Sequence, residues 1–198
     1  MDDQPNEWPV NGGECAARSR PRESGCIEVE GIRMDVYIRS VAREDVPFVQ
    51  TFCAMASVSE LTSIPHPYPV DGARQWFHQV TNNARAGVMW PWTIVCDDQF
   101  AGIIALKRPE PSTGAVDYWV APPFWGQGVA TRAVGCVVRH AWDQGLQILR
   151  SYCLSSNVAS RKVLEKNGFI LIREAPMASG KHAGQAFAYY GLRLDSAD

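Results

Sequence analysis

A chain of 198 residues is long enough for one domain with a buried core, and two ordinary domains would be an unusual fit. Its hydrophobic content of 46% and charged content of 20% are those of a globular protein, which argues against a fibrous or wholly disordered chain. The formal net charge of −2 lacks the basic excess typical of nucleic-acid-binding proteins, so we expect no nucleic-acid partner.

The sequence also predicts a compartment. No run of about 18 apolar residues occurs, and the N-terminus opens with Met1-Asp2-Asp3 instead of a basic segment followed by an apolar one. We therefore expect a cytoplasmic protein with no membrane partner. The six cysteines lie far apart, with no CxxC pair and no histidine at zinc-ligand spacing. Reduced, mostly buried thiols and no metal site are the expectation.

Two regions differ in composition. Residues 1–33 are rich in Gly, Pro, Arg, Glu and Ser and show no apolar period, which predicts a disordered leader. Residues 34–198 then form the folded domain. Val36 and Ile38 alternate with their neighbours as in a strand, and residues 42–55 show the apolar spacing of a helix.

A proline-rich segment interrupts the helical pattern at residues 64–69, because proline restricts its own backbone and that of the preceding residue. A second helix follows, which Asp71 can cap. Next come residues 92–96 and 100–107, two β-rich runs joined by a short polar turn. They predict an antiparallel hairpin.

Residues 115–120 predict a further strand, which two prolines halt. A long helix should begin near Gly128, since apolar residues then recur on one face of a helix. Gly145 is placed to end this helix in the left-handed conformation.

The C-terminal part alternates between strands and a helix. Residues 147–154 predict a strand, and Asn157 is a suitable N-cap for a helix that Gly168 would end. Residues 169–175 and 187–194 predict two last strands around a polar loop.

The loop before the long helix is the most informative segment. Glycines at positions 126 and 128 allow the backbone to approach a bulky anion closely, and the first N–H groups of the helix would point at that anion. A pyrophosphate suits such a nest. A plain glycine turn and a dinucleotide-binding GxGxxG loop are the alternatives. The second is weak, because Pro122 and Pro123 break the strand ahead and the strand that follows supplies no acid for a ribose.

A second segment, residues 157–169, follows one strand after the helix of the glycine loop. Together the two segments resemble the GNAT family of N-acetyltransferases, in its ribosomal-protein N-terminal acetyltransferase-like branch. The glycine loop resembles the family motif of Gln or Arg, two residues, Gly, one residue, then Gly or Ala. The proline-rich residues 64–69 resemble the substrate-side segment of this branch, and the resemblance covers about residues 36–194.

The resemblance implies an α/β (α+β) fold. Its central sheet is mixed and mostly antiparallel, with about seven strands, and about four helices flank it. The sheet splays in the middle, between the strand ending at Val120 and the strand ending at Leu154. The pantetheine arm of acetyl-CoA would lie in that gap.

By resemblance, acetyl-CoA is the co-substrate and an amine is the acceptor. Backbone groups at the end of the strand that finishes at Val120 would pair with the pantetheine arm. Backbone amides of the glycine loop would bind the pyrophosphate, and the Asn157 side chain would form a hydrogen bond with the arm from the opposite side of the gap. The residues so assigned are Val120, Trp125, Gly126, Gln127, Gly128, Val129, Ala130, Thr131 and Asn157.

The catalytic residues depart from the family pattern. Leu164 stands where many relatives have a tyrosine acid, and Ser160 resembles a serine of this branch, which makes Ser160 the candidate acid or thiol-orienting group. An ordinary hydroxyl on the helix surface is the alternative, since serine is a poor acid. Ala115 falls where relatives carry a glutamate base, and Asp117, on the same strand face, is the candidate base. A solvated carboxylate is the competing interpretation.

The acceptor is less defined than the cofactor. His66 and Tyr68 lie in the proline-rich loop and are candidates for substrate contact, although such an aromatic often packs beneath its loop. An α-amine such as a protein N-terminus is the favoured acceptor. An amino acid, a polyamine or an aminoglycoside, and a non-catalytic acyl-CoA-binding module, are the alternatives. The sequence leaves a homodimer open.

Overall fold

The computed structural model describes residues 34–194, so the leader predicted at residues 1–33 lies outside the described residues. Within them the chain forms seven strands, five α-helices and two short 3-10 helices. The strands are β1 (Val36–Ser40), β2 (Met89–Cys96), β3 (Gln99–Glu110), β4 (Thr113–Val120), β5 (Ile148–Leu154), β6 (Ile170–Pro176) and β7 (Ala186–Arg193). The helices are η1 (Arg43–Asp45), α1 (Val46–Cys53), α2 (Ala56–Glu60), α3 (Gly72–Arg85), η2 (Pro122–Phe124), α4 (Val129–Asp143) and α5 (Val158–Lys166).

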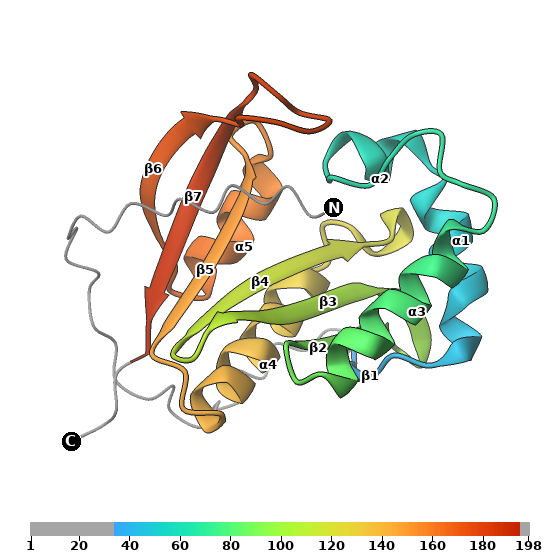
Figure 1. Cartoon of the computed structure of the whole chain (residues 1–198), viewed down its shortest axis with the longest axis horizontal. Coiled ribbons are helices and arrows are strands. Elements are labelled where there is room, and N and C mark those ends of the chain that lie inside the picture. The colour runs from blue at the N-terminus through green and yellow to red at the C-terminus, as the bar shows by residue number, and fades with distance from the viewer. Residues whose placement is uncertain (1–33, 195–198) are drawn as a thin grey trace.

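The seven described strands form one sheet in the order β1-β2-β3-β4-β5-β7-β6 (Figure 1). Every neighbouring pair is antiparallel except β4 and β5, which are parallel. A helix connects the two parallel strands, as a parallel pair requires. The mixed, mostly antiparallel sheet predicted from the sequence is confirmed.

The sheet splits between β4 and β5. Only residues 113–115 of β4 pair with residues 148–150 of β5, although β4 continues to Val120 and β5 to Leu154. Where the pairing ends, the buried Ser151 hydroxyl donates a hydrogen bond of 2.9 Å to the Val116 carbonyl. The split therefore opens toward the carboxyl ends of both strands, where the sequence predicts it.

Helices cover both faces of the sheet, and successive strand residues contribute to opposite sides. Ile104 belongs to the larger core cluster, which includes Val134 and Val137 of α4, whereas Ile103 belongs to a smaller cluster beneath α1 and α3. This division follows from the alternation of side chains along a strand. In Figure 1, α4 and α5 accordingly lie behind the sheet and α3 lies in front of it.

Two local predictions were incomplete. Residues 42–55 form the 3-10 helix η1 and then α1, and the separate five-residue helix α2 was not anticipated, so the helices outnumber the predicted set. A helix of that length makes fewer than two turns and therefore shows no apolar period. Asp71 precedes α3 but its side chain does not cap the helix. Its carboxylate accepts a hydrogen bond of 2.7 Å from Gln75 Nε2 instead.

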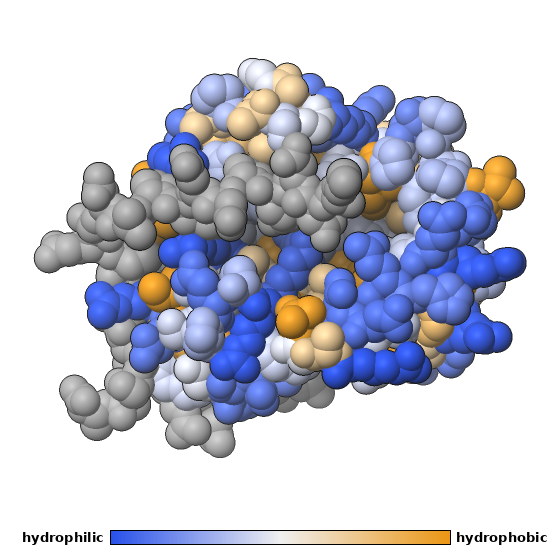
Figure 2. All heavy atoms as spheres, in the orientation of Figure 1, coloured by the Kyte–Doolittle hydropathy of each residue, from blue (hydrophilic) through white to orange (hydrophobic). Residues whose placement is uncertain are grey.

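The surface agrees with this layering. Within residues 34–194, no helix has the length and apolar character needed to cross a membrane. Outside the grey atoms, the face shown in Figure 2 is mainly hydrophilic, and apolar side chains are scattered among charged ones. Scattered apolar side chains of this kind are normal for a folded domain and do not define an interface.

His140 connects α4 to the sheet through two aromatic contacts. Its ring lies edge-on to Trp90 and Trp92, with centroid distances of 5.6 and 4.9 Å. Its Nε2 atom is buried and has no hydrogen-bond partner among the described residues. Burial lowers the pKa of the imidazole below its usual 6.5, and the charge of Asp143 offsets this only in part.

This lowered pKa predicts a pH-dependent stability. As pH falls below 6.5, the unfolded chain binds a proton at His140 more readily than the folded chain does, so the free energy of unfolding should decrease. We expect His140→Gln to flatten this dependence in urea titrations between about pH 7.5 and about pH 5.5. The same change at His78, which is exposed on α3, is the control. An equal slope in the His140 variant and the parent would contradict the prediction.

Candidate functional site

The glycine loop leads from β4 into α4 at the open end of the split. Gly126 and Gly128 have positive φ angles of 75° and 79°, a conformation that residues with a Cβ atom adopt at a cost. A Cβ atom added at either position would meet no other atom within 4 Å. These two glycines are therefore explained by backbone conformation, and the space above them is open.

The start of α4 adds hydrogen-bond donors to this loop. Gly128 is the N-cap residue, and the N–H of Arg132 donates to its carbonyl at 3.1 Å. By the geometry of an α-helix, the N–H groups before Arg132 have no partner four residues back. They lie at the positive end of a 15-residue helix. Such a helix start is suited to an anion. The pyrophosphate expected at this loop stays a prediction.

Trp125 makes a contact that the sequence did not indicate. Its indole Nε1 donates a hydrogen bond of 2.6 Å to the carbonyl of Val120 at the end of β4, while its side chain stays 42% exposed. Val120 was expected to pair with the cofactor arm through its backbone. A carbonyl oxygen has a second lone pair, so the indole occupies only part of that capacity.

Asn157 and Ser160 lie on the other wall of the split, at the start of α5. The Asn157 side-chain oxygen accepts a hydrogen bond of 3.0 Å from the Ser160 N–H, which confirms the predicted N-cap. None of residues 34–194 accepts a hydrogen bond from the Asn157 Nδ2 atom, so the amide retains its donors. Leu164, further along α5, is fully buried and packs in the core.

Tyr118 of β4 reaches across the split to Ser160. The two hydroxyl oxygens are 2.7 Å apart, and burial raises the pKa of the Tyr118 phenol above its ordinary value although the bond to Ser160 opposes that shift. Cys153 of β5 completes the group: burial raises the pKa of its thiol to about 11, and a hydrogen bond from Ser160 acts in the opposite direction. Tyr118 did not emerge from the sequence. Its only signal was strand alternation, which places it opposite Asp117.

Asp117 lies on the other face of β4 from Tyr118. Its carboxylate forms an ion pair of 2.7 Å with the Lys107 ammonium of β3, and both side chains are about one-third exposed. Asp117 therefore does not join the hydroxyl pair of Tyr118 and Ser160. Its carboxylate faces the side of the sheet that α1 and α3 cover.

The proline-rich loop separates its two candidate residues. His66 is exposed, whereas Tyr68 is half-buried in the cluster beneath α1 and α3. Tyr68 packs in the same cluster as the buried Cys53 of α1, and burial raises the pKa of the Tyr68 hydroxyl above its ordinary value. Tyr68 thus packs beneath its loop, as the alternative interpretation expected. His66 is exposed and is the candidate that remains accessible to an acceptor.

The connection between β6 and β7 contacts the segment before the proline-rich loop. Lys181 donates to the hydroxyl and carbonyl of Ser59 and, at 2.8 Å, to the carbonyl of Ile64. The His182 ring nitrogen Nε2 lies 2.8 Å from the Thr62 carbonyl. Figure 1 shows this connection beside α2, at the end of the molecule where β5 ends and β7 begins. The sequence did not predict this bridge, because its partners are more than 100 residues apart.

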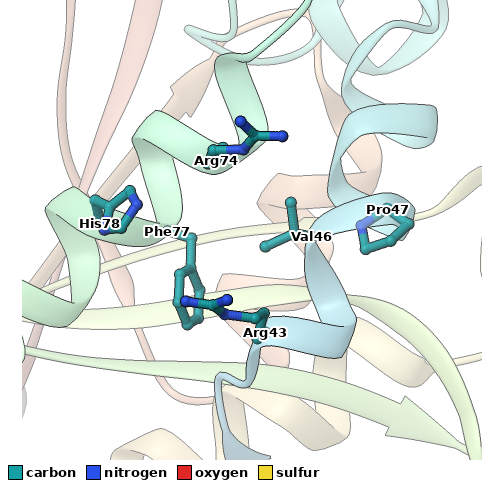
Figure 3. A pocket seen from close by; sticks show the side chains of 6 residues that line it. All are labelled: Arg43, Val46, Pro47, Arg74, Phe77 and His78. Atoms are coloured by element: carbon teal, nitrogen blue, oxygen red, sulfur yellow. The ribbon is translucent and has the colours of Figure 1, made fainter.

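A separate hollow lies between α1 and α3 (Figure 3). It has a volume of about 430 Å³, and its lining residues are Arg43, Val46, Pro47, Arg74, Phe77 and His78. These side chains come from η1, α1 and α3, on the face of the sheet opposite α4. The hollow is therefore distinct from the glycine loop and from the pair of hydroxyls in the split.

Comparison with known protein families decides the family. The model of the acetyltransferase (GNAT) domain matches residues 35–170, which is more than half of the chain. The chain belongs to the GNAT acetyltransferase family. The GNAT resemblance inferred from the glycine loop and the Asn157 segment is thereby confirmed.

Individual GNAT relatives fall in the expected branch. Over 78 residues the chain is 32% identical to the ribosomal-protein-serine acetyltransferase of Escherichia coli (strain K12), a segment that is 38% of this chain and 44% of that relative. The match therefore spans less than half of the curated relative.

Solved structures share the fold. RimL, a ribosomal-protein α-N-acetyltransferase solved with coenzyme A, matches with a TM-score of 0.75 and 19% identity over 82% of this chain and 96% of its own. A spermidine N-acetyltransferase from Vibrio cholerae, solved with CoA and spermine, matches with a TM-score of 0.70 and 12% identity over 80% and 95%. At these identities the likeness establishes the GNAT fold and does not distinguish between acceptors.

Among the side chains of residues 34–194, no group of three His, Cys, Asp or Glu is arranged to hold a metal ion. The polar groups that converge on the split of this GNAT domain are instead hydroxyls, a thiol, an amide and backbone N–H groups.

Proposed function

We propose that this chain transfers the acetyl group of acetyl-CoA to the α-amine of a protein N-terminus. The observation that carries the proposal is the position of the glycine loop: it follows directly from β4, the strand that forms one wall of the split. An anion-binding helix start and an adjacent split suit a molecule that has a pyrophosphate at one end and an extended arm.

Each part of acetyl-CoA has residues suited to it. N–H groups of residues 126–131 would take the pyrophosphate, and the backbone of β4 near Val120 would pair with the arm. Asn157 would donate its amide from the α5 side. No atom lies within 4 Å of a Cβ atom added at Gly126 or Gly128, so the space beside these two glycines is open. This open space supports the placement of the pyrophosphate there.

The chemistry requires a neutral amine, a stabilised oxyanion and a proton for the leaving sulfur. We place Ser160 on the sulfur side, because it lies on the α5 wall of the split and its hydroxyl meets that of Tyr118 from the β4 wall at 2.7 Å. Asp117 remains our proposed base, acting through water from the α1 and α3 face. The Lys107 ammonium pairs with this carboxylate at 2.7 Å, so the carboxylate is not free to contact the amine directly.

A ribosomal protein is the acceptor we favour, because the Escherichia coli relative is a ribosomal-protein-serine acetyltransferase. Such an acceptor is met in the cytoplasm, where we expect the chain to act. His66, exposed in the proline-rich loop, is the side chain we propose to contact it.

The acceptor class can be tested with one assay. Release of free thiol from acetyl-CoA should be followed with N-terminal peptides, free amino acids, polyamines and aminoglycosides at equal concentration. We expect the peptides to give the highest kcat/KM. Faster release with a polyamine or an aminoglycoside would assign the chain to a small-molecule acetyltransferase.

A further inference from the structure

The hydroxyl pair in the split suggests a second residue that serves the reaction. We propose that Tyr118 is a positioning residue, whose phenol orients the Ser160 hydroxyl so that the serine proton points at the sulfur leaving the thioester. This inference rests on the proposed function, because it assumes that acetyl-CoA lies in the split.

The first support is the place of the contact. Tyr118 belongs to the part of β4 that no longer pairs with β5, and Ser160 belongs to the first turn of α5 on the other wall. Their hydroxyl oxygens lie 2.7 Å apart, which is the usual length of a strong O–H···O bond. β4 and β5 form no backbone pairs at this position, and the hydrogen bond between the two hydroxyls connects the β4 wall of the split to the α5 wall.

The second support is the direction of that bond. A phenol is far more acidic than an alcohol, so Tyr118 is the better donor and Ser160 the better acceptor. Burial raises the pKa of Tyr118, which keeps its proton in place at neutral pH. The 2.7 Å distance allows either hydroxyl to donate, and the proposed role takes Tyr118 as the donor to Ser160.

The third support is the set of hydrogen-bonding groups that remains on Ser160. Its backbone N–H donates to the Asn157 side chain, and in the proposed arrangement its hydroxyl oxygen accepts the hydrogen bond from Tyr118. With Tyr118 as the donor, the serine O–H is the donor that remains on this side chain. It lies on the α5 wall of the split and is the group that would donate to the sulfur of the leaving group.

The step balances without a further reactant. The amine nitrogen bonds to the carbonyl carbon, the carbon–sulfur bond breaks, and its electron pair stays on sulfur. Ser160 supplies a hydrogen bond and a proton to that sulfur, and water restores the serine proton. The nitrogen loses one proton as the amide forms, which equals the proton gained by the thiol.

A double-mutant cycle tests this role. Ser160→Ala should lower kcat with little change in acetyl-CoA affinity, and Tyr118→Phe should lower kcat by about tenfold with KM for acetyl-CoA nearly unchanged. Because Tyr118 acts through Ser160, the double variant should be no slower than Ser160→Ala alone. Tyr37→Phe is the matched control, since it removes an exposed tyrosine hydroxyl that bonds to Asp98, and it should keep the parent kcat.

Several outcomes would overturn the inference. An unchanged kcat in a folded Tyr118→Phe variant, or losses that multiply in the double variant, would show that Tyr118 does not act through Ser160. Even if Tyr118→Phe alone fails to fold, the double variant leaves neither hydroxyl unpaired and can be compared with Ser160→Ala. If the parent itself releases no thiol with any acceptor, the proposed function fails instead, which the parent assay shows separately.

Discussion

Gly128→Trp should weaken acetyl-CoA binding at least tenfold, equivalent to about 1.4 kcal/mol. Gly128 has a φ of 79° at the N-cap of α4, and the space where its side chain would project is open. An indole placed there would occupy the volume that we assign to the pyrophosphate. Isothermal titration calorimetry with acetyl-CoA measures the effect directly.

The control for this variant is Gly145→Trp. Gly145 follows α4 at its other end, has a φ of 71°, and likewise has no atom within 4 Å of an added Cβ. Both variants place a tryptophan in the left-handed conformation at an open site, so they carry similar backbone strain. We expect only the Gly128 variant to lose affinity. Equal affinities in the two folded variants would remove the glycine loop from the cofactor site.

The second large effect concerns the acceptor: the enzyme should acetylate an α-amine in preference to a lysine side chain. An amine must lose its proton before it attacks, and α-amino groups have a pKa near 7.7–8.0, compared with about 10.4 for lysine. At neutral pH roughly a tenth of an α-amine is neutral, whereas the neutral fraction of lysine is smaller than one in a thousand. Ala115 supplies no carboxylate and Asp117 is held in an ion pair with Lys107, so neither position of β4 offers a carboxylate that is free to deprotonate a lysine side chain directly.

Two peptides of one sequence test this preference. One is blocked at its α-amine and keeps an internal lysine, and the other has the lysine blocked and a free N-terminus. Mass spectrometry should show much faster acetylation of the peptide with the free N-terminus. Faster modification of the lysine peptide would indicate a strong base elsewhere in the domain.

Much of the fold followed from local patterns. The long apolar period of α4, its glycine boundaries and the N-cap at Asn157 are properties of neighbouring residues, so the sequence alone placed them correctly. The helix α2 did not follow, because five residues are too few to show a period. The split was predicted only through the GNAT resemblance, and the pairing of β4 with β5 confirms it.

The candidate site was less predictable than the fold. The glycine loop could be recognised because its residues are contiguous. Two glycines so close together before a helix indicate a loop with positive φ angles, which the structure shows at Gly126 and Gly128. The contact between Tyr118 and Ser160 joins residues 42 positions apart, and the bridge from Lys181 to Ile64 joins residues 117 positions apart. Such contacts depend on strand order and on how far the sheet splays, which no local pattern encodes.

We propose that this GNAT domain uses acetyl-CoA to acetylate an α-amine. The most direct test incubates the full chain with acetyl-CoA and a peptide that has a free N-terminus, and measures free thiol and N-terminally acetylated peptide in the same sample. We predict that both accumulate in equal amounts over many turnovers. Heat of acetyl-CoA binding without thiol release, with the peptide unmodified, would contradict the account and identify a non-catalytic acyl-CoA-binding module.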